Sequence, residues 1–182
     1  MLRKGVKIVS IPRRDKKRRM KTLLLVRHAK SSWDDPTLSD KVRPLNKRGI
    51  RDVITMGQRL LSRQVKPDRI VASSAVRTTI TAQSIAKELG YPQEDILLDD
   101  RLYACQPEYL LETVQAFDND LDYVMLVGHF PELNDFLFMF TSDIEHMPTC
   151  AMAELTFDVS NWTEIRQNNL QKVLFDYPKK EV

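Results

Sequence analysis

Arginine and histidine side chains directly follow three apolar segments of the sequence that read as buried strands. The segment LLLV ends in an arginine and a histidine, VMLVG is followed by a histidine, and RIVA leads through two serines to an arginine in the first turn of a predicted helix. In an open parallel sheet, ligands bind in the crevice beyond the carboxyl ends of the strands. The sequence therefore predicts one crevice lined by Arg27, His28, Arg77 and His129.

This combination of side chains suits a phosphate group. Guanidinium groups stay charged at any physiological pH and offer paired donors that match phosphate oxygens. A neutral imidazole between them can attack phosphorus, while the cations stabilise charge on the equatorial oxygens. Such chemistry requires no metal ion or other cofactor, and the sequence has neither a Walker loop nor a dense carboxylate cluster that would hold one.

Each of these residues, taken alone, has a simpler interpretation. Arg27 and His28 would form a salt-bridged strand end. Arg77 would be a solvated helix charge, and His129 a structural histidine, although the glycine before it permits close approach of the backbone to a ligand. Their joint occurrence at successive strand ends is what favours phosphate chemistry. His146 lies in the polar segment DIEHMPT and is expected to be part of a surface loop.

Strand-like and helical segments alternate along the chain, which predicts a mostly parallel sheet covered on both faces. Asn46 and Ser74 are the expected N-caps of two helices, Gly90 is an expected helix stop and Pro107 an expected first-turn proline. No linker divides the chain, so residues 20–182 are expected to form one α/β domain, a three-layer sandwich without a large helical insertion. The predicted strands are 22–26, 69–72, 96–98, 123–127, 153–157 and 173–175, and the predicted helices are 46–65, 75–89, 107–117 and 131–140.

The formal charge of +3 is unevenly distributed along the chain. Residues 1–19 hold nine Lys or Arg and one acid, which leaves 19 basic and 24 acidic residues, a charge of about −5, for the remainder. A nucleic-acid-binding domain would carry basic charge on its fold, so nucleic acid is not an expected partner. Residues 1–19 are expected to be a disordered extension, or an upstream translation artefact if Met20 is the natural start. A nucleic-acid or membrane-surface arm is the alternative.

The sequence has no mark of a membrane, secreted or disulfide-rich protein. No apolar stretch approaches the roughly 20 residues of a membrane helix, and the basic leader lacks the apolar core of a secretory signal. Cys105 and Cys150 have neither zinc-ligand spacing nor a secretory context. We therefore expect reduced thiols and a cytoplasmic protein with no membrane partner.

Three ordered motifs carry a resemblance to a known family. The segments LVRHAKSSW, SSAVRTTITA and LVGHFPEL resemble the RHG, second-arginine and GH motifs of the histidine phosphatase superfamily, whose fold is phosphoglycerate-mutase-like. The segment LSDKVRPLNKRG and the short chain narrow the resemblance to SixA-type phosphohistidine phosphatases. The similarity runs from about residue 21 to at least residue 140, which is most of the expected domain.

The resemblance implies a role for each motif residue. His28 would be the nucleophile that becomes phosphorylated. Arg27, Arg77 and His129 would form the phosphate pocket, with His129 cationic when a dianion is bound. Arg43, in the segment VRPL, would add a contact to substrate or phosphate; the alternative is a surface charge that anchors its loop.

One position departs from the family pattern, and the general acid of the family has two candidates in this sequence. Ala29 stands where the motif has glycine, a small change if this residue has a negative φ. Relatives carry a general acid after the second-arginine helix, and Asp100, or else Asp99, lies at about that point. Such a donor needs a raised pKa. Otherwise the acidic pair is a solvated turn.

By this resemblance the chain is expected to be a metal-independent phosphatase in signal transduction that acts on phosphohistidine in a partner protein. Without a lid, the pocket should be shallow enough to admit a side chain that projects from a partner. The alternatives are a phosphatase of small phosphoesters and a non-catalytic phosphate-binding module. Trp33, Tyr103 and Trp162 are expected to be packing residues, with substrate entrance as the alternative for the first two.

Overall fold

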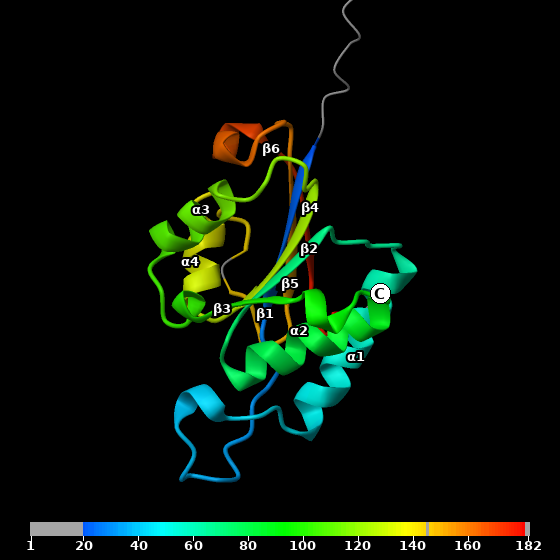
Figure 1. Ribbon diagram of the computed structural model, residues 1–182, viewed down its shortest axis with the longest axis vertical. Helices are drawn as coiled ribbons and strands as arrows, with labels where there is room; N and C mark the ends of the chain where they lie inside the picture. The colour runs from blue at the N-terminus through cyan, green and yellow to red at the C-terminus, as the bar shows by residue number, and fades with distance from the viewer. Residues whose placement is uncertain (1–19, 145, 181–182) are drawn as a thin grey trace, which may run out of the picture.

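The structure is a computed structural model that describes residues 20–144 and 146–180 (Figure 1). Residues 1–19, where an extension is expected, lie outside the described residues. The described strands and helices occur where the sequence predicts them, with boundaries that differ by up to three residues. The strands are β1 (Lys21–Arg27), β2 (Arg69–Ser73), β3 (Leu97–Asp99), β4 (Tyr123–Gly128), β5 (Met152–Phe157) and β6 (Leu170–Asp176), and the α-helices are α1 (Lys47–Ser62), α2 (Val76–Leu89), α3 (Pro107–Gln115) and α4 (Glu132–Phe138).

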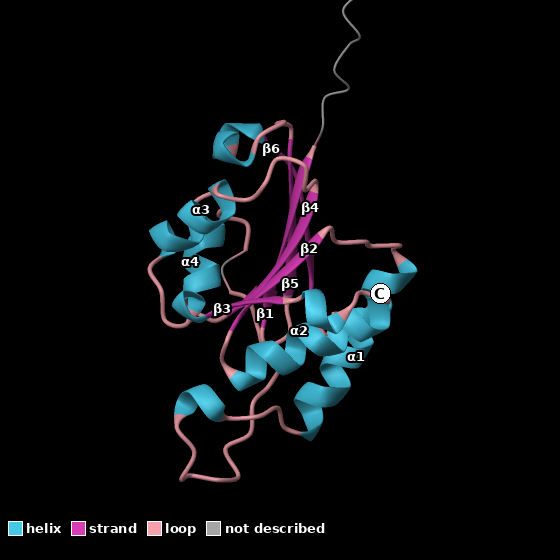
Figure 2. Ribbon diagram, viewed as in Figure 1, coloured by secondary structure: helices cyan, strands magenta, loops and turns pink. Residues whose placement is uncertain are grey.

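The six strands of the described chain form one sheet in the order β3-β2-β4-β1-β5-β6. Strands β1 to β4 are parallel to one another, and β5 runs antiparallel to its neighbours β1 and β6. Figure 2 shows the helices in two layers on either side of the sheet, α3 and α4 on one side and α1 and α2 on the other. The predicted α/β sandwich with a mostly parallel central sheet is confirmed.

Side chains of β1 alternate between the two faces of the sheet, as the two-residue period of a strand requires. Leu23 and Leu25 pack in the cluster that includes α3 and α4, whereas Leu24 and Val26 pack in the cluster that includes α1 and α2. All four side chains are fully buried. The strand is therefore held from both sides, which fixes the position of Arg27 at its carboxyl end.

Local signals fix the start of α1 and the end of α2. The Asn46 side-chain oxygen accepts a hydrogen bond from the Gly49 N–H at 2.8 Å, as expected of an N-cap. Gly49 is required there because a Cβ would lie 2.2 Å from the carbonyl oxygen of Lys30. The start of α1 thus lies directly against the chain that follows β1. Gly90 ends α2 in the left-handed conformation at φ 68°, as predicted.

One local prediction is wrong. Ala75, not Ser74, is the N-cap of α2, because the Ser74 hydroxyl donates a hydrogen bond to Asp100 instead. The segment between β5 and β6 contains two short 3₁₀ turns. Trp162 in the first turn is fully buried and donates its Nε1–H to the Leu121 carbonyl at 2.9 Å. The packing role expected for Trp162 is confirmed.

Neither cysteine of the chain is paired. Cys105 and Cys150 are both free thiols, as the sequence predicts. Burial raises the pKa of the Cys150 thiol to about 12, so this side chain stays protonated and unreactive. As for membranes, no helix within residues 20–144 and 146–180 has the length and apolar character needed to span one.

Candidate active site

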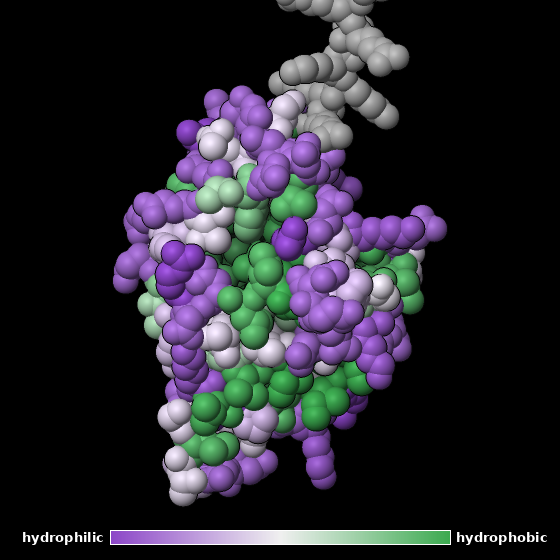
Figure 3. Space-filling view, in the orientation of Figure 1, coloured by the Kyte–Doolittle hydropathy of each residue, from purple (hydrophilic) through white to green (hydrophobic). Residues whose placement is uncertain are grey.

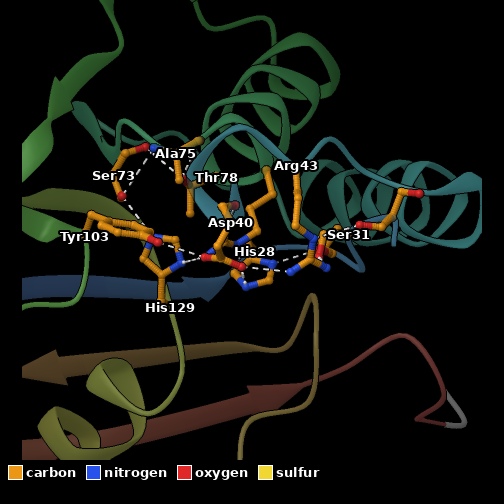
Figure 4. Close-up of polar contacts among 12 residues, drawn as sticks. His28, Ser31, Asp40, Arg43, Ser73, Ala75, Thr78, Tyr103 and His129 are labelled. Carbon is orange, nitrogen blue, oxygen red and sulfur yellow. Dashed lines mark hydrogen bonds and ion pairs between the residues drawn. The ribbon is translucent and has the colours of Figure 1, made fainter. Parts of the chain in front are cut away.

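The carboxyl ends of the central strands bring the predicted residues together at one edge of the sheet (Figure 4). β1 ends at Arg27 before His28, and its neighbour β4 ends immediately before His129. Arg77, in the first turn of α2, lies between the two imidazoles. Its Nε is 3.3 Å from Nε2 of His28, and its Nη2 is 3.3 Å from Nδ1 of His129. The four residues therefore share one crevice.

His28 presents one ring nitrogen to this crevice. Its Nδ1 lies 2.8 Å from the carbonyl oxygen of Ala29. Because a carbonyl oxygen only accepts hydrogen bonds, Nδ1 carries the proton of the neutral ring and Nε2 keeps the lone pair. Nε2 is the nitrogen that faces Arg77. The ring is thus held in the tautomer and orientation of a nucleophile.

Both histidines are neutral at physiological pH. Burial, with smaller effects of the Arg77 and Arg27 charges, lowers the pKa of His28 to about 4. Burial, followed by the proximity of His28 and Arg77, lowers the pKa of His129 to about 3. The Nε2 lone pair of His28 is therefore present across the physiological pH range. His129 is fixed by a second contact, between its Nε2 and the Ser73 hydroxyl at 2.9 Å.

Asp40, which the sequence analysis did not single out, joins the arginines of the crevice. Its Oδ2 accepts hydrogen bonds from Arg77 Nη2 at 2.9 Å and from the Tyr103 hydroxyl at 2.8 Å. Its Oδ1 accepts one from Arg43 Nη1 at 2.8 Å. Burial alone would raise the pKa of the Asp40 carboxyl, but the donors Tyr103, Arg77 and Arg43 hold it below the usual value. The signal that could have found Asp40 is its position three residues before Arg43 in the SixA-like segment.

Arg43 is buried, with only 5% of its surface exposed, so it is not the surface charge of the alternative, although it does anchor its loop. Its Nε donates to the Ser32 carbonyl and its Nη2 to the Ser31 hydroxyl, both at 2.8 Å. The Trp33 ring covers the guanidinium, with 3.2 Å from Cζ to the ring centroid. Trp33 is 70% exposed, so its expected place among the packing residues is wrong. It lies instead at the surface, above an arginine of the crevice.

Arg27 is held on the other side of His28. Its Nη1 donates to the Met147 carbonyl at 2.6 Å, and the Phe130 ring lies 4.7 Å from its Cζ. Within the described residues, the buried Nε–H of Arg27 has no hydrogen-bond partner. Burial lowers the pKa of Arg27, yet a guanidinium stays charged at physiological pH. A buried donor without a partner is costly, and a bound anion could satisfy it.

A cavity of about 220 Å³ lies among these side chains. Four of its lining residues are cationic and one is an acid, so its charge favours an anion such as a phosphoryl group. Within residues 20–144 and 146–180, no three His, Cys, Asp or Glu side chains are grouped so that they could hold a metal ion. The cavity is lined by Arg27, His28, Lys30, Ser31, Trp33, Asp40, Arg43, Arg77 and Thr149.

A roomier cavity, of about 580 Å³, lies between β3 and α3. Figure 3 shows apolar surface on this face, and Leu97 and Leu98 of the edge strand β3 are about half exposed. Among the described residues, the one cation that lines the cavity, Arg101, forms an ion pair with Asp99, and the remaining charged lining residue is the acid Glu112. This cavity contains no histidine and no buried arginine. The smaller cavity is the one with residues that can carry out a reaction.

Asp100, the expected general acid, lies outside the smaller cavity. Its carboxylate is exposed and accepts hydrogen bonds from Lys41 and Ser74, which lower its pKa. Asp99 is bound by Arg101 and Tyr109, and the Arg101 hydrogen bond lowers the pKa of Asp99 as well. A general acid needs a raised pKa. Neither carboxylate has that property in this structure.

Three further positions complete the site. The Tyr103 ring meets the His129 ring edge-on, with 5.4 Å between centroids, so these two rings pack together behind the residues that line the cavity. Ala29 is fully buried and is not among the non-glycine residues with positive φ in the described chain, which explains why alanine fits the motif's glycine position. His146 is exposed in a loop, as expected, with its ring against Phe130.

Comparison with known proteins agrees with the motifs. Residues 23–105 match the sequence profile of the Histidine phosphatase superfamily (branch 1). The candidate phosphohistidine phosphatase SixA of Agrobacterium tumefaciens is 30% identical, with a TM-score of 0.69 over 74% of this chain and 90% of that one. An uncharacterised chloroplastic protein of Arabidopsis thaliana is 29% identical over 78% of this chain and 69% of its own length. A phosphoglycerate mutase of Plasmodium falciparum shares the fold, with a TM-score of 0.57 at 17% identity over 87% of this chain and 89% of that one.

Proposed function

Because the chain belongs to the histidine phosphatase superfamily, we propose that it removes the phosphoryl group from phosphohistidine on a partner protein, through a covalent intermediate on His28. The observation that carries this proposal is the neutral His28 ring. Its Nδ1 proton is held by the Ala29 carbonyl, and its Nε2 lone pair faces Arg77 at a cationic cavity. A fixed nucleophile among cations is what phosphoryl transfer requires.

In the proposed reaction, Arg27, Arg43 and Arg77 bind the phosphoryl oxygens. His28 Nε2 attacks phosphorus, and a P–N bond forms there as the bond to the leaving nitrogen breaks. The leaving imidazole takes up one proton. Water then attacks the phosphohistidine, gives up one proton, and releases phosphate while the electron pair returns to Nε2. His129, beside Arg77, becomes cationic when a dianion is bound, because added negative charge favours its protonated form.

Three observations support phosphohistidine as the substrate. The cavity is small, with the exposed Trp33 ring in its lining, which suits one phosphorylated side chain presented by a partner. Asp100 lacks the raised pKa of a general acid, and a leaving imidazole depends less on an enzyme acid than an alkoxide does. The similar protein from Agrobacterium tumefaciens is named as a candidate phosphohistidine phosphatase.

The experiment that tests the proposal compares phosphate release from a phosphohistidine-bearing protein with release from p-nitrophenyl phosphate. Wild type should act on the protein, and His28→Ala should not. His146→Ala is the matched control, because it removes an exposed histidine outside the cavity. Rapid turnover of the ester alone would indicate a phosphatase of small phosphoesters. Inactivity of a folded wild type on both substrates would indicate a phosphate-binding module.

The same proposal covers the need for a metal ion, the part of the chain that is required, and the cellular compartment. The guanidinium groups supply the positive charge, so turnover should need no metal ion or cofactor and should persist in EDTA. Residues 20–182 should suffice for activity, which truncation of residues 1–19 would check. Two free thiols, Cys105 and Cys150, fit a reducing compartment such as the cytoplasm, and a phosphohistidine protein as substrate fits a role in signal transduction.

A further inference from the structure

The Asp40 carboxylate occupies the position between two arginines of the cavity. One oxygen accepts from Arg43 Nη1 at 2.8 Å and the other from Arg77 Nη2 at 2.9 Å. Figure 4 shows this carboxylate next to His28, between Tyr103 and Arg43. The donors it uses are therefore those that would otherwise bind the oxygens of a phosphoryl group.

A carboxylate and a phosphoryl group cannot both hold these donors. Each guanidinium presents its N–H groups in a fixed plane, and one acceptor oxygen takes each position. A phosphoryl dianion beside an ionised carboxylate would also be repelled by it. The pKa of Asp40 is held below its usual value, so the carboxylate is charged at neutral pH. A phosphoryl group that takes the Arg43 Nη1 and Arg77 Nη2 donors must therefore displace the Asp40 carboxylate from them.

The chain around Asp40 permits this movement. Asp40 begins the short 3₁₀ turn η1 (Asp40–Val42), none of whose residues is buried, and its side chain is 49% exposed. The Asp40 carbonyl has its own hydrogen bond from Arg77 Nη1 at 2.6 Å. The side chain can therefore rotate outward while the backbone stays in place. The Tyr103 hydroxyl, which also donates to Oδ2, offers the carboxylate a partner outside the arginine pair.

We propose that Asp40 is a built-in competitor for the phosphoryl site, whose carboxylate exchanges with the phosphoryl group of the substrate at Arg43 and Arg77. It sets how tightly the pocket holds a phosphoryl group. In the free protein it neutralises the buried arginines, and after the reaction it displaces inorganic phosphate. This inference rests on the proposed function, because it concerns the same pocket, but it is tested by binding rather than by turnover.

The test measures the affinity for inorganic phosphate by calorimetry at pH 7, for wild type, Asp40→Asn and Asp40→Ala. Both substitutions remove the competing charge, so phosphate should bind about 10-fold more tightly or better. Asp35→Asn is the matched control. It removes the same charge from the same loop. Asp35 is exposed there, and within residues 20–144 and 146–180 it accepts hydrogen bonds from Thr37.

Two further measurements distinguish a change in phosphate affinity from a folding defect. Removal of Asp40 leaves buried arginines without their acceptor, so the variants should melt at a lower temperature than wild type. Phosphate should then raise their melting temperature by more than it raises that of wild type. In turnover assays, KM should fall in Asp40→Asn, and inhibition by product phosphate should become stronger by a similar factor.

The possible results separate this inference from the proposed function. Unchanged or weaker phosphate binding in both Asp40 variants would overturn the inference, and Asp40 would then be a positioning residue for the arginines. Tighter phosphate binding in a protein that hydrolyses nothing would uphold the inference and contradict the proposed function. Tightening of the same size in Asp35→Asn would also overturn it, because the effect would then be one of net charge.

Discussion

Both ends of strand β1 carry a cation, fully buried at Lys21 and half-buried at Arg27, but they hold it in different ways. At the amino end, Lys21 is fully buried, and its ammonium group donates to the carbonyls of Asn119 at 2.6 Å and Leu121 at 2.9 Å and to Asp122 at 2.8 Å. Three donors meet three acceptors, two of them in the backbone. At the carboxyl end, Arg27 donates to one carbonyl and keeps a buried Nε–H without a partner among the described residues.

This difference separates a structural cation from one that is available to a ligand. Two of the three groups that match Lys21 are backbone carbonyls, which the fold holds in place, and the third is the Asp122 carboxylate, whose side chain is 42% exposed. The cations near Arg27 are matched by Asp40, a half-exposed side chain on a short turn, and they surround a cavity. Burial of charge therefore does not by itself indicate function. What indicates function is a buried charge whose partners are missing or replaceable.

The largest effect is expected at His28. His28→Asn should lower kcat by about 10³-fold or more, because it removes the nucleophile of the proposed reaction. The stability of the fold should be largely retained, since the residue lies at the cavity and not in the apolar core. Steady-state kinetics with the phosphohistidine protein would measure the loss. His146→Asn, the exposed histidine, should keep wild-type kinetics.

Arg77→Lys should reduce kcat/KM by about 10²-fold, because lysine keeps the charge but loses the planar fork. Arg77 uses all three nitrogens of that fork: Nε toward His28, Nη2 toward His129 and the Asp40 carboxylate, and Nη1 toward the Asp40 carbonyl. Kinetics on the same substrate would measure the effect. Arg101→Lys provides the control, since Arg101 pairs with Asp99 outside the cavity. Equal losses in the two variants would contradict a specific role for the Arg77 guanidinium.

Lys21→Met should have the opposite effect to the substitutions of His28 and Arg77. It should lower the stability of the fold and leave catalytic turnover unchanged. Removal of the ammonium leaves buried carbonyl groups without a donor, so the free energy of unfolding should fall by about 2–4 kcal/mol. Urea denaturation would measure this fall. The turnover per folded molecule should stay within about 2-fold of wild type. A variant that folds normally but loses activity would remove the distinction between the two ends of β1.

The pH dependence of stability should also report on the carboxyl end of β1. The pKa values of His28 and His129 are lowered to about 4 and 3, so the folded state binds fewer protons than the unfolded state below about pH 6.5. The contribution of these two histidines to the free energy of unfolding is therefore complete above pH 6.5, and it decreases as the pH drops toward 4. At pH 5 the contribution lost through His28 is about 2 kcal/mol. Denaturation of His28→Asn at pH 7 and pH 5 should show a smaller fall than denaturation of wild type.

The smallest effect is expected at Asp100. Its carboxylate is exposed, and its partners Lys41 and Ser74 keep its pKa low rather than raised. Asp100→Asn should therefore change turnover of the phosphohistidine protein by less than about 2-fold, compared with the 10²-fold or greater contributions typical of general acids. A larger loss would show that Asp100 changes its surroundings when substrate binds.

The sequence predicted those parts of the site that strand ends determine. Arg27, His28 and His129 follow apolar strands directly, so the hydrophobic pattern and the parallel arrangement were enough to bring them together. Asp40 could not be found in this way, since it lies on a short 3₁₀ turn and meets Tyr103 from 63 residues away in the sequence. The path of a loop depends on contacts that form only in the folded chain.

The same limit explains the errors in local detail. Ser74 has the chemistry of an N-cap, but its hydroxyl bonds to Asp100, which a 3₁₀ turn after β3 brings near it. Trp33 has a large apolar side chain of the kind that usually packs in a core, but it covers Arg43 at the surface. In both cases a tertiary partner overrides the local preference. The fold itself was predictable because its signal is repeated over every strand and helix.

The measurement that tests the central claim most directly is the trapping of a phosphorylated form of the protein. The protein would be mixed with a ³²P-labelled phosphohistidine protein, quenched in alkali within milliseconds to seconds, and digested for peptide mapping. The account predicts alkali-stable label on the peptide that contains His28, present in His146→Asn and absent in His28→Asn. Label on another residue, or fast turnover with undiminished label in His28→Asn, would contradict it.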